Sequence, residues 1–138
     1  MAKKNALPHH LKQLLEKGDL QYQSGISVDC VIFGFHEQKL KILLLKIDAV
    51  DKWALPGGFI KKSEPIEAAA YRVLKERTGV QHIFLQQFHV FGDPDRSDAS
   101  VHQKRYLNYG VKIPKDNWLI QRFITIGFYA LIDFLTEI

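Results

Sequence analysis

The chain has 138 residues, the length of a single domain, and its 46% hydrophobic and 25% charged residues are typical of a globular protein. Such a chain can form a core without disulfides or a structural metal, and its single cysteine, Cys30, excludes an intramolecular disulfide. The formal charge of +4 suits an anionic ligand or weak contact with nucleic acid, but an ordinary solvated surface explains it equally well.

Neither a targeting signal nor a membrane span is visible in the sequence. Met1–Lys4 is basic, but no apolar segment follows it as one does in a signal peptide. The longest apolar-rich stretch, Phe123–Leu135, is shorter than the run of about 18 apolar residues that suggests a membrane helix. Cys30 lies in the apolar run Val28–Phe35, which favours a buried, unreactive thiol. We therefore expect a cytoplasmic protein with no membrane contact.

The first predicted element is a short amphipathic helix over Leu7–Lys17, with Gly18 as its stop. Its apolar residues at helical spacing are Leu7, Leu11, Leu14 and Leu15. The polar stretch Gln21–Ser27 predicts a linker. We therefore divide the chain into an N-terminal helix and linker over residues 1–26 and one domain over residues 27–138.

Two strands and a glycine loop are predicted next. Val28–Phe35 and Leu40–Ile47 are apolar and branched on either side of a polar turn, which predicts a β-hairpin. The run Leu43–Leu45 indicates that the second strand is buried on both faces. After a polar loop, Trp53–Gly58 reads WALPGG, where the backbone conformation rather than the side chains is specified.

A second helix begins at Ser63 or Glu64, with Pro65 in its first turn, where the missing N–H does no harm. It ends at Thr78, and Gly79 is a natural left-handed residue after a helix. Its predicted buried face is Ile66, Ala69, Ala70, Val73 and Leu74.

The rest of the chain predicts two strands and a long connection. Ile83–Phe91 and Gln121–Phe134 have the composition of strands. Gly92–Trp118 between them is expected to be irregular, and a connection of this length is usually functional or flexible.

The stretch from the glycine loop to the end of the second helix carries a spaced motif. Five residues separate Gly58 from Glu64, seven separate Glu64 from Arg72, and Gly79 and Val80 close the motif. The pattern resembles the signature of the Nudix hydrolase family, G-x5-E-x7-R-E-U-x-E-E-x-G-U with U aliphatic, and seven of its nine specified positions match. The resemblance implies an α+β fold, a Nudix-type α/β/α sandwich with a mixed β-sheet.

The family motif implies metal chemistry on the helix. Its carboxylates bind divalent cations, usually Mg²⁺, which neutralise a pyrophosphate and activate water. Hard cations require oxygen ligands, so carboxylates are expected at positions 73, 76 and 77, within about one helical turn. Only Glu76 is acidic here, because the other two positions hold Val73 and Arg77. Glu76 and the carbonyl of Gly57 remain as candidate metal ligands, and Glu76 is the catalytic candidate if the site is active.

Arg77 reverses the charge at an expected metal ligand. Two like charges roughly 4 Å apart repel by about 4 kcal/mol at an effective dielectric near 20. An arginine pointing into the site therefore deters Mg²⁺ and is suited to bind a phosphate or carboxylate itself. The alternative is that Glu67, Glu76 and Arg77 form a solvated helix face.

The residues that set the geometry of the motif are retained. They are Gly58, Glu64, Arg72 and Gly79. We expect Glu64 and Arg72 to form an ion pair that braces the loop against the helix.

A second resemblance covers about residues 27–134, with Ser97–Gln121 only loosely matched. It is to Nudix-related transcriptional regulators, in which a Nudix-like sensor of ADP-ribose or sugars precedes a winged helix that binds DNA. The stretches that carry it are SVDCVIFGF, KILLLK, RVLKERTGV, LQQFHVFGDPDR and ITIGFYALID.

This second resemblance implies a set of ligand-binding candidates. Asp93 and Arg96 would lie in a loop on the ligand side, with Arg77 and Lys46 as further candidates. The alternative for the FGDPDR segment is a tight turn. A basic and aromatic group in the same connection either contacts phosphate or is exposed surface; it consists of His102, Lys104, Arg105 and Tyr106.

The family fold normally continues with a further strand and helix, and the regulators with a winged helix. We therefore expect the chain to be incomplete at its C-terminus, either an N-terminal piece or a chain completed by a partner. An unfinished sheet leaves an exposed edge, which favours a homodimer. DNA is a candidate partner only through a C-terminal domain that this chain does not contain.

The leading hypothesis is a non-catalytic Nudix-like ligand-sensing domain of a transcriptional regulator, binding ADP-ribose, a related nucleotide or a sugar without a cofactor. The alternative is a Mg²⁺-dependent hydrolase of nucleoside diphosphate derivatives that recruits other carboxylates. Candidates for that role are Glu64, Glu67, Asp93 and Asp95. A third hypothesis is an interaction module with no small ligand.

Overall fold

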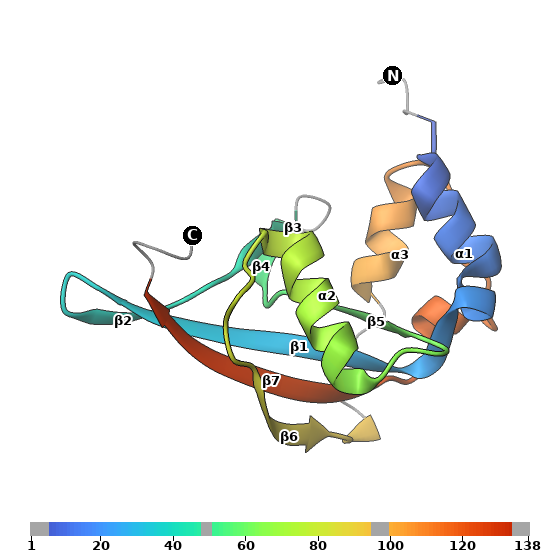
Figure 1. Ribbon diagram of the computed structural model, residues 1–138. Helices are drawn as coiled ribbons and strands as arrows, with labels where there is room; N and C mark the ends of the chain where they lie inside the picture. The colour runs from blue at the N-terminus through green and yellow to red at the C-terminus, as the bar shows by residue number, and fades with distance from the viewer. Residues whose placement is uncertain (1–5, 48–50, 95–99, 134–138) are drawn as a thin grey trace.

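The computed structural model of this chain describes residues 6–47, 51–94 and 100–133 (Figure 1). Its main sheet has five strands and is mixed. The long strand β1 (Tyr22–His36) pairs antiparallel with β2 (Lys39–Ile42) and β5 (Gly57–Lys61), and parallel with β7 (Ile124–Asp133). Strand β6 (Gln86–Phe91) lies antiparallel to β7 at the edge. The expected mixed α+β fold is therefore confirmed.

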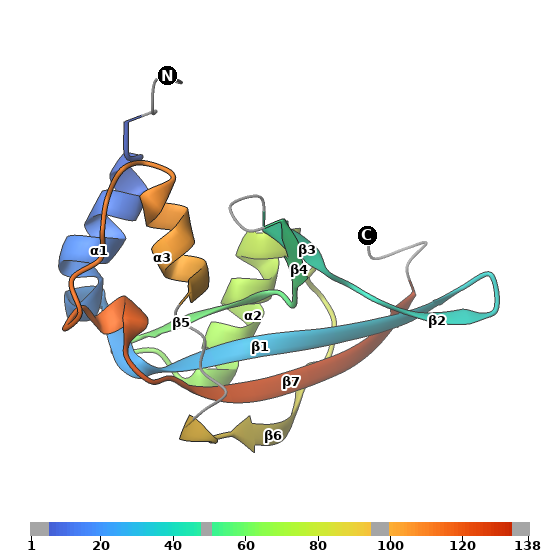
Figure 2. The same cartoon turned by 180° about the vertical axis from the view of Figure 1, so that it is seen from behind.

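One face of the sheet packs against helix α2 (Ile66–Thr78), as Figures 1 and 2 show. Alternate residues of β1 point to this face, and Val28, Cys30 and Ile32 have no exposed surface. The core there also includes buried residues of α2 and of β7, namely Ala69, Ala70, Val73, Leu74, Ile126, Phe128, Ala130 and Ile132. Within the three described ranges, no helix covers the opposite face of the sheet.

Cys30 is buried against α2, as its apolar surroundings predict. Its Sγ lies 3.8 Å from the carbonyl oxygen of Ala70. Burial, together with the nearby Asp29 carboxylate, raises the pKa of the Cys30 thiol to about 12. The thiol is therefore a small core side chain and not a nucleophile.

A second core lies at one end of the sheet, where α1 (His9–Gln21) and α3 (Ser100–Leu107) stand side by side (Figures 1 and 2). Its buried residues are Leu11, Tyr106, Ile113, Trp118, Leu119 and Phe123. The Tyr106 hydroxyl donates to the carbonyl of Leu11, and the indole N–H of Trp118 donates to the carbonyl of Leu14 at 3.0 Å. The N-terminal helix is therefore packed against the rest of the chain.

The first predicted helix ends too early. Helix α1 continues through Gly18 to Gln21, and the polar stretch that predicted a linker begins β1 instead. A Cβ atom at Gly18 would lie 2.3 Å from Cζ2 of Trp118, so this glycine serves close packing and is not a helix stop. Tyr22 at the start of β1 pairs with Lys61 in β5, which explains why the polar segment is extended.

The predicted hairpin is confirmed, but its second strand is interrupted. Residues 39–42 pair with β1, and the chain then leaves the sheet to form β3 (Leu45–Ile47) with β4 (Lys52–Ala54). The expected burial on both faces is wrong: Leu40, Ile42 and Leu44 are exposed, and only Leu43 packs on the core from this run. Composition alone does not reveal that this strand lies at an edge.

Helix α2 ends as predicted, and Gly79 adopts a φ of +78°. Pro65 is the N-cap, and the predicted buried face holds except for Ile66, which is partly exposed.

The connection after β6 is more ordered than expected. Within Gly92–Trp118, residues 100–107 form α3 and residues 118–120 form the short 3₁₀ helix η2 (Trp118–Ile120). Tyr106 is fully buried, so the exposed-surface alternative fails for this residue. No helix in the described ranges is long and apolar enough to cross a membrane.

Candidate functional site

A cavity of about 1020 Å³ lies over β5. Strand β5 lies between α2 and α3 in Figures 1 and 2. Strands β1, β3 and β5, the C-terminal turn of α2 and one side of α3 all contribute to its wall. Its polar and charged lining includes Asp29, Lys46, Glu76, Arg77, His102 and Arg105. The glycine loop of the motif also lines the cavity, so the cavity is the candidate site.

The glycines allow the loop to lie close to its neighbours. A Cβ atom at Gly57 would lie 2.2 Å from Oδ1 of Asp29, and one at Gly58 would lie 3.0 Å from Cγ2 of Val73. Val73 is 3% exposed, so the residue that replaces an expected carboxylate has become part of the core. Backbone from β5 is therefore brought against β1 on one side and α2 on the other.

Arg72 connects the loop after β5 to α2. Its Nε donates to Oε2 of Glu64 at 2.7 Å and its Nη2 to Oε1 of Glu64 at 2.9 Å, which makes a two-pronged ion pair. Nη2 also donates to the carbonyl of Phe59 at 2.7 Å. The side chains of Arg72 and Glu64 are only 17% and 14% exposed. The hydrogen bond from Arg72 holds the pKa of Glu64 below its ordinary value.

The same arginine engages the one acidic residue left in the expected metal cluster. Nη1 of Arg72 donates to Oε2 of Glu76 at 3.1 Å, an i,i+4 ion pair on α2. Glu76 lines the cavity, but its carboxylate is paired with a cation and its side chain is 59% exposed. The carboxylate of Glu76 is therefore occupied by its ion pair with Arg72.

Arg77 occupies the other expected ligand position and reaches across to the loop. Its Nε donates to the carbonyl oxygen of Gly57 at 3.1 Å. That carbonyl is the backbone oxygen that the sequence suggested as a candidate metal ligand. Burial lowers the pKa of Arg77 from its ordinary value, and the nearby positive charge of Arg105 lowers it further. The guanidinium nevertheless stays charged at neutral pH.

These contacts do not fit a divalent cation. Mg²⁺ needs an octahedral set of oxygens, usually including at least one free carboxylate. Here the Gly57 carbonyl accepts from a guanidinium, and Glu76 is paired with Arg72. In the part of the chain that the structure describes, no group of three or more His, Cys, Asp and Glu residues is arranged to hold a metal ion.

Helix α3 brings Val101, His102 and Arg105 to the cavity. The imidazole of His102 stacks on the ring of Phe59, with centroids 6.1 Å apart. Its Nδ1 is buried and has no hydrogen-bond partner among the described residues. Burial, and then the charges of Arg105 and Arg77, lower the pKa of His102 to about 4. His102 is therefore neutral at physiological pH, and both arginines act on it electrostatically.

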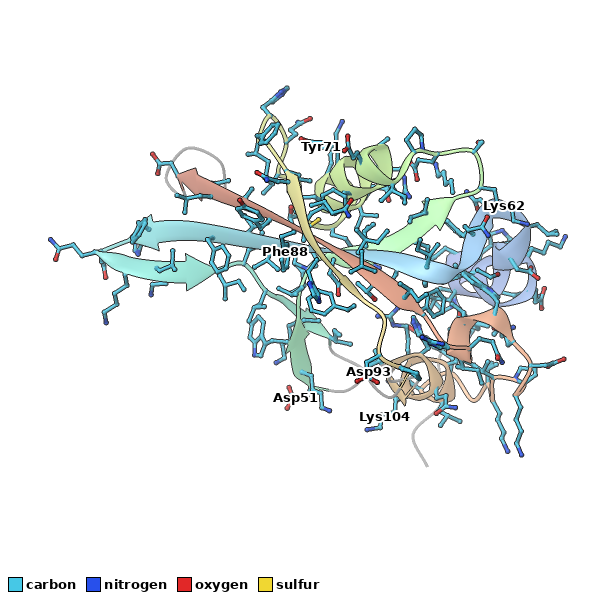
Figure 3. The ribbon with its side chains drawn as sticks, turned by 90° about the horizontal axis from the view of Figure 1, so that it is seen from below. Asp51, Lys62, Tyr71, Phe88, Asp93 and Lys104 are labelled. Carbon is cyan, nitrogen blue, oxygen red and sulfur yellow. The ribbon has the colours of Figure 1, made fainter. Side chains whose placement is uncertain are left out.

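The structure places the other predicted candidates less centrally. Lys46 lines the cavity and forms an exposed ion pair with Asp51 at 3.4 Å. Asp93 is exposed and is not part of the cavity lining, although it lies toward the α3 end of the molecule in Figure 3. Arg96 and Asp95 lie outside the described residues. Glu67 is exposed on α2, away from the cavity wall.

One charged residue of the cavity lining, Asp29, was not predicted from the sequence. Asp29 lies in the middle of β1, beside Gly57, and its carboxylate lines the cavity. A single acidic residue within the apolar run VDCVIFGF was the available signal, because a charge inside a buried strand usually has a specific role.

Comparison with known proteins gives one family match and several relatives. Residues 23–122 match the family model described as NUDIX domain. The ADPR responsive transcriptional repressor NtrR of Acinetobacter baylyi is 34% identical over 87 residues, covering 55% of this chain and 35% of that protein. The ADP-ribose pyrophosphatase of Methanocaldococcus jannaschii is 34% identical over 89 residues, covering 62% of this chain and 53% of that protein.

A solved structure supports the same relationship. The crystal structure of Shewanella oneidensis NrtR matches with a TM-score of 0.57 and 29% identity, covering 80% of this chain and 44% of that chain. The chain thus spans about a third to a half of the length of these relatives.

Proposed function

Because this chain belongs to the Nudix domain family, we propose that it is a ligand-sensing domain that binds an ADP-ribose-type nucleotide and does not hydrolyse it. The observation that carries the proposal is the hydrogen bond from Nε of Arg77 to the Gly57 carbonyl. It puts a fixed cation at the place where a hydrolase of this family would need Mg²⁺. A site with this charge attracts the anionic part of a nucleotide, and its cation opposes the binding of the Mg²⁺ that would activate water.

The cavity supports a ligand of this size. Small-molecule sites commonly have volumes of about 300–1,000 Å³, and this cavity has about 1020 Å³. Both curated relatives are named for ADP-ribose, one as a responsive repressor and one as a pyrophosphatase. A sugar remains the second ligand class, since the polar lining from Asp29 and Lys46 suits hydroxyl groups as well.

The regulatory part of the proposal rests on the Acinetobacter relative, which is a transcriptional repressor. The matched region makes up 35% of the length of that protein. By analogy, DNA contact would come from a further domain, and the role of this chain is to sense the ligand in the cytoplasm.

We also propose a homodimer, because β6 is an edge strand with Phe88 and Val90 exposed. Light scattering tests the dimer, and a monomeric mass at micromolar concentration would exclude it.

The second candidate function is a Mg²⁺-dependent ADP-ribose pyrophosphatase. One observation favours it: the carboxylate of Asp29 lies beside Gly57 in the same cavity as Glu76. These two carboxylates are the pair that a metal would have to recruit, because Glu64 is held by Arg72 and Glu67 lies away from the cavity.

The two functions are separated by measuring binding and turnover on the same sample. We expect calorimetry to detect ADP-ribose binding and product analysis to detect no ADP-ribose cleavage with Mg²⁺ present. Cleavage that is lost in Glu76→Gln would overturn the non-catalytic proposal. Neither binding nor cleavage, with ADP-ribose, dinucleotides and simple sugars all tried, would favour an interaction module instead.

A further inference from the structure

Two arginines from different helices line the same cavity. Arg77 comes from the last turn of α2, and Arg105 comes from α3. Arg105 is close enough to lower the pKa of Arg77, so the two positive charges repel each other. Among the described residues, neither arginine has a carboxylate within ion-pair distance. The folded protein therefore holds two neighbouring cations without an ion-pair partner in the described part of the chain, Arg77 exposed and Arg105 half-buried.

The arginine pair also has N–H donors that no acceptor in the described residues uses. Arg77 uses Nε for the Gly57 carbonyl, and its Nη1 and Nη2 donate to no acceptor in the described part of the chain. A guanidinium carries five N–H donors in a planar fork that matches the oxygens of a phosphate. Fixing Nε on the loop orients the rest of the fork and removes part of the entropy cost of binding.

His102 adds a second, independent indication of a ligand. It precedes Arg105 by one helical turn on α3, so the two side chains share one face of this helix. Its Nδ1 is a buried polar atom that lacks a partner among the described residues, and an unmet polar group of this kind is costly. That atom has almost no exposed surface, so an acceptor on a ligand reaches it only when the imidazole turns toward the cavity that His102 lines.

We propose that Arg77, Arg105 and His102 form a metal-free site for the diphosphate of the bound nucleotide, held between α2 and α3. This inference rests on the proposed function and specifies how the anionic part of the ligand is recognised. The diphosphate supplies two negative charges, which end the repulsion within the arginine pair, and oxygens that accept from both guanidinium groups. Arginine thus does in binding what Mg²⁺ does in a hydrolase, without activating water.

A purely structural role for Arg77 is the competing explanation. A cation in the last turn of a helix is stabilised by the helix dipole, and Lys75 lies in the same turn. Lys75→Gln is therefore a matched control for Arg77→Gln. Lys104, exposed on α3 and labelled in Figure 3, is the matched control for Arg105, because Lys104→Gln removes the same charge from the same helix.

The test is calorimetric titration with ADP-ribose and, separately, with inorganic pyrophosphate, each in EDTA and in Mg²⁺. We expect wild-type affinity for ADP-ribose to be the same in both buffers. Arg77→Gln and Arg105→Gln should each weaken binding of both probes by at least about tenfold, as expected for loss of a charge-assisted hydrogen bond. Arg105→Lys should fall in between, and the two lysine controls should stay within about twofold. Thermal melts verify that every variant is folded.

The outcomes separate this inference from the proposed function. Binding that EDTA abolishes, or equal affinities for Arg77→Gln and Lys75→Gln, would overturn the inference and leave ADP-ribose as the ligand. Arginine-dependent binding of pyrophosphate without any binding of ADP-ribose would support the inference and overturn the choice of ligand. No binding of either probe would overturn both.

Discussion

Arg72 shows how one residue of the motif can have a structural role that is independent of metal chemistry. It bonds to Glu64 twice, to the Phe59 carbonyl and to Glu76, so it joins β5, the loop after it and two turns of α2. None of these contacts requires a metal. This explains why the Glu64–Arg72 spacing is intact while two carboxylate positions of the motif have changed.

Replacing Arg72 with Gln should lower the stability of the fold substantially. The change leaves the Glu64 carboxylate, 14% exposed, without its partner and the Phe59 carbonyl without a donor. We expect a loss of about 2–4 kcal/mol in the free energy of unfolding, measured by urea denaturation. Lys62→Gln removes an exposed charge from the loop between β5 and α2 (Figure 3). This control should change the free energy of unfolding by less than about 0.5 kcal/mol. Similar values for the two variants would show that the arginine network contributes little.

His102 should make stability fall in mildly acidic solution. Its pKa in the folded protein is about 4, below its ordinary value of 6.5, chiefly because it is buried. As the pH falls below 6.5, the unfolded chain takes up a proton on this residue before the folded chain does. Its contribution to stability is therefore complete above pH 6.5, declines toward pH 4 and levels off below that.

The measurement is the free energy of unfolding at intervals from pH 7.5 to pH 4.5, compared with His102→Phe, which keeps an aromatic ring against Phe59. We expect a shallower decline for the variant in this interval. The lowered pKa of Glu64 does not affect this comparison, since the stability that Glu64 contributes is lost only as the pH falls below the ordinary value of 4.5. Parallel curves for the two proteins would mean that His102 is not buried as described.

Among the elements, α1 and α3 are positioned by tertiary contacts more than by their own sequences. Helix α1 is held by Trp118, whose indole lies on Gly18 and donates to the Leu14 carbonyl. Helix α3 is anchored by Tyr106, which is fully buried and donates to the Leu11 carbonyl. Because α3 carries His102 and Arg105, the packing of the second core determines one wall of the cavity.

Gly18→Ala should disrupt this contact. Alanine is a better helix former than glycine by about 1 kcal/mol, so an isolated helix would gain stability. In the folded chain the new Cβ would lie 2.3 Å from Cζ2 of Trp118, and the indole is also fixed by its hydrogen bond. We expect a net loss of about 1–3 kcal/mol.

Urea denaturation checks the sign of the Gly18→Ala effect, with Asp19→Ala at the neighbouring exposed position of α1 as control. The control should be neutral or slightly stabilising, because it changes helix propensity without a steric contact. A stabilised Gly18→Ala protein would mean that the indole can move and that Gly18 only lowers the helix propensity of α1.

At the scale of the whole molecule, two cores meet at the candidate site. The first lies between the sheet and α2, and the second lies among α1, α3 and η2. Phe59 in β5 packs on the second core, while its neighbour Ile60 belongs to the first. Members of the second core, including Leu11, Leu119 and Phe123, line the cavity, while Arg77 comes from α2, which packs on the first core. A site that combines Arg77 with Arg105 therefore requires both cores to be formed.

Much of the central fold was predictable from local pattern. Gly79 places the end of α2 to the residue, whereas the predicted start at Ser63 or Glu64 is two or three residues before the observed start at Ile66. The β1–β2 hairpin follows from two apolar runs around a polar turn. The ends of α1 and the course of the chain after β2 were not predictable, since they depend on Trp118 and on pairing with distant strands.

For the candidate site, there is a physical reason why the sequence determined some features and only the tertiary structure decided the others. The sequence by itself determined the Gly58–Val80 spacing and the loss of two carboxylates. That spacing indicated the family and the Glu64–Arg72 ion pair, because the motif fixes how far Glu64 in the loop lies from Arg72 on α2. Only the tertiary structure decided that Arg77 bonds to the Gly57 carbonyl and that Glu76 is held by Arg72. It also brought His102 and Arg105 to the same cavity, since contacts between distant segments depend on how the helices pack.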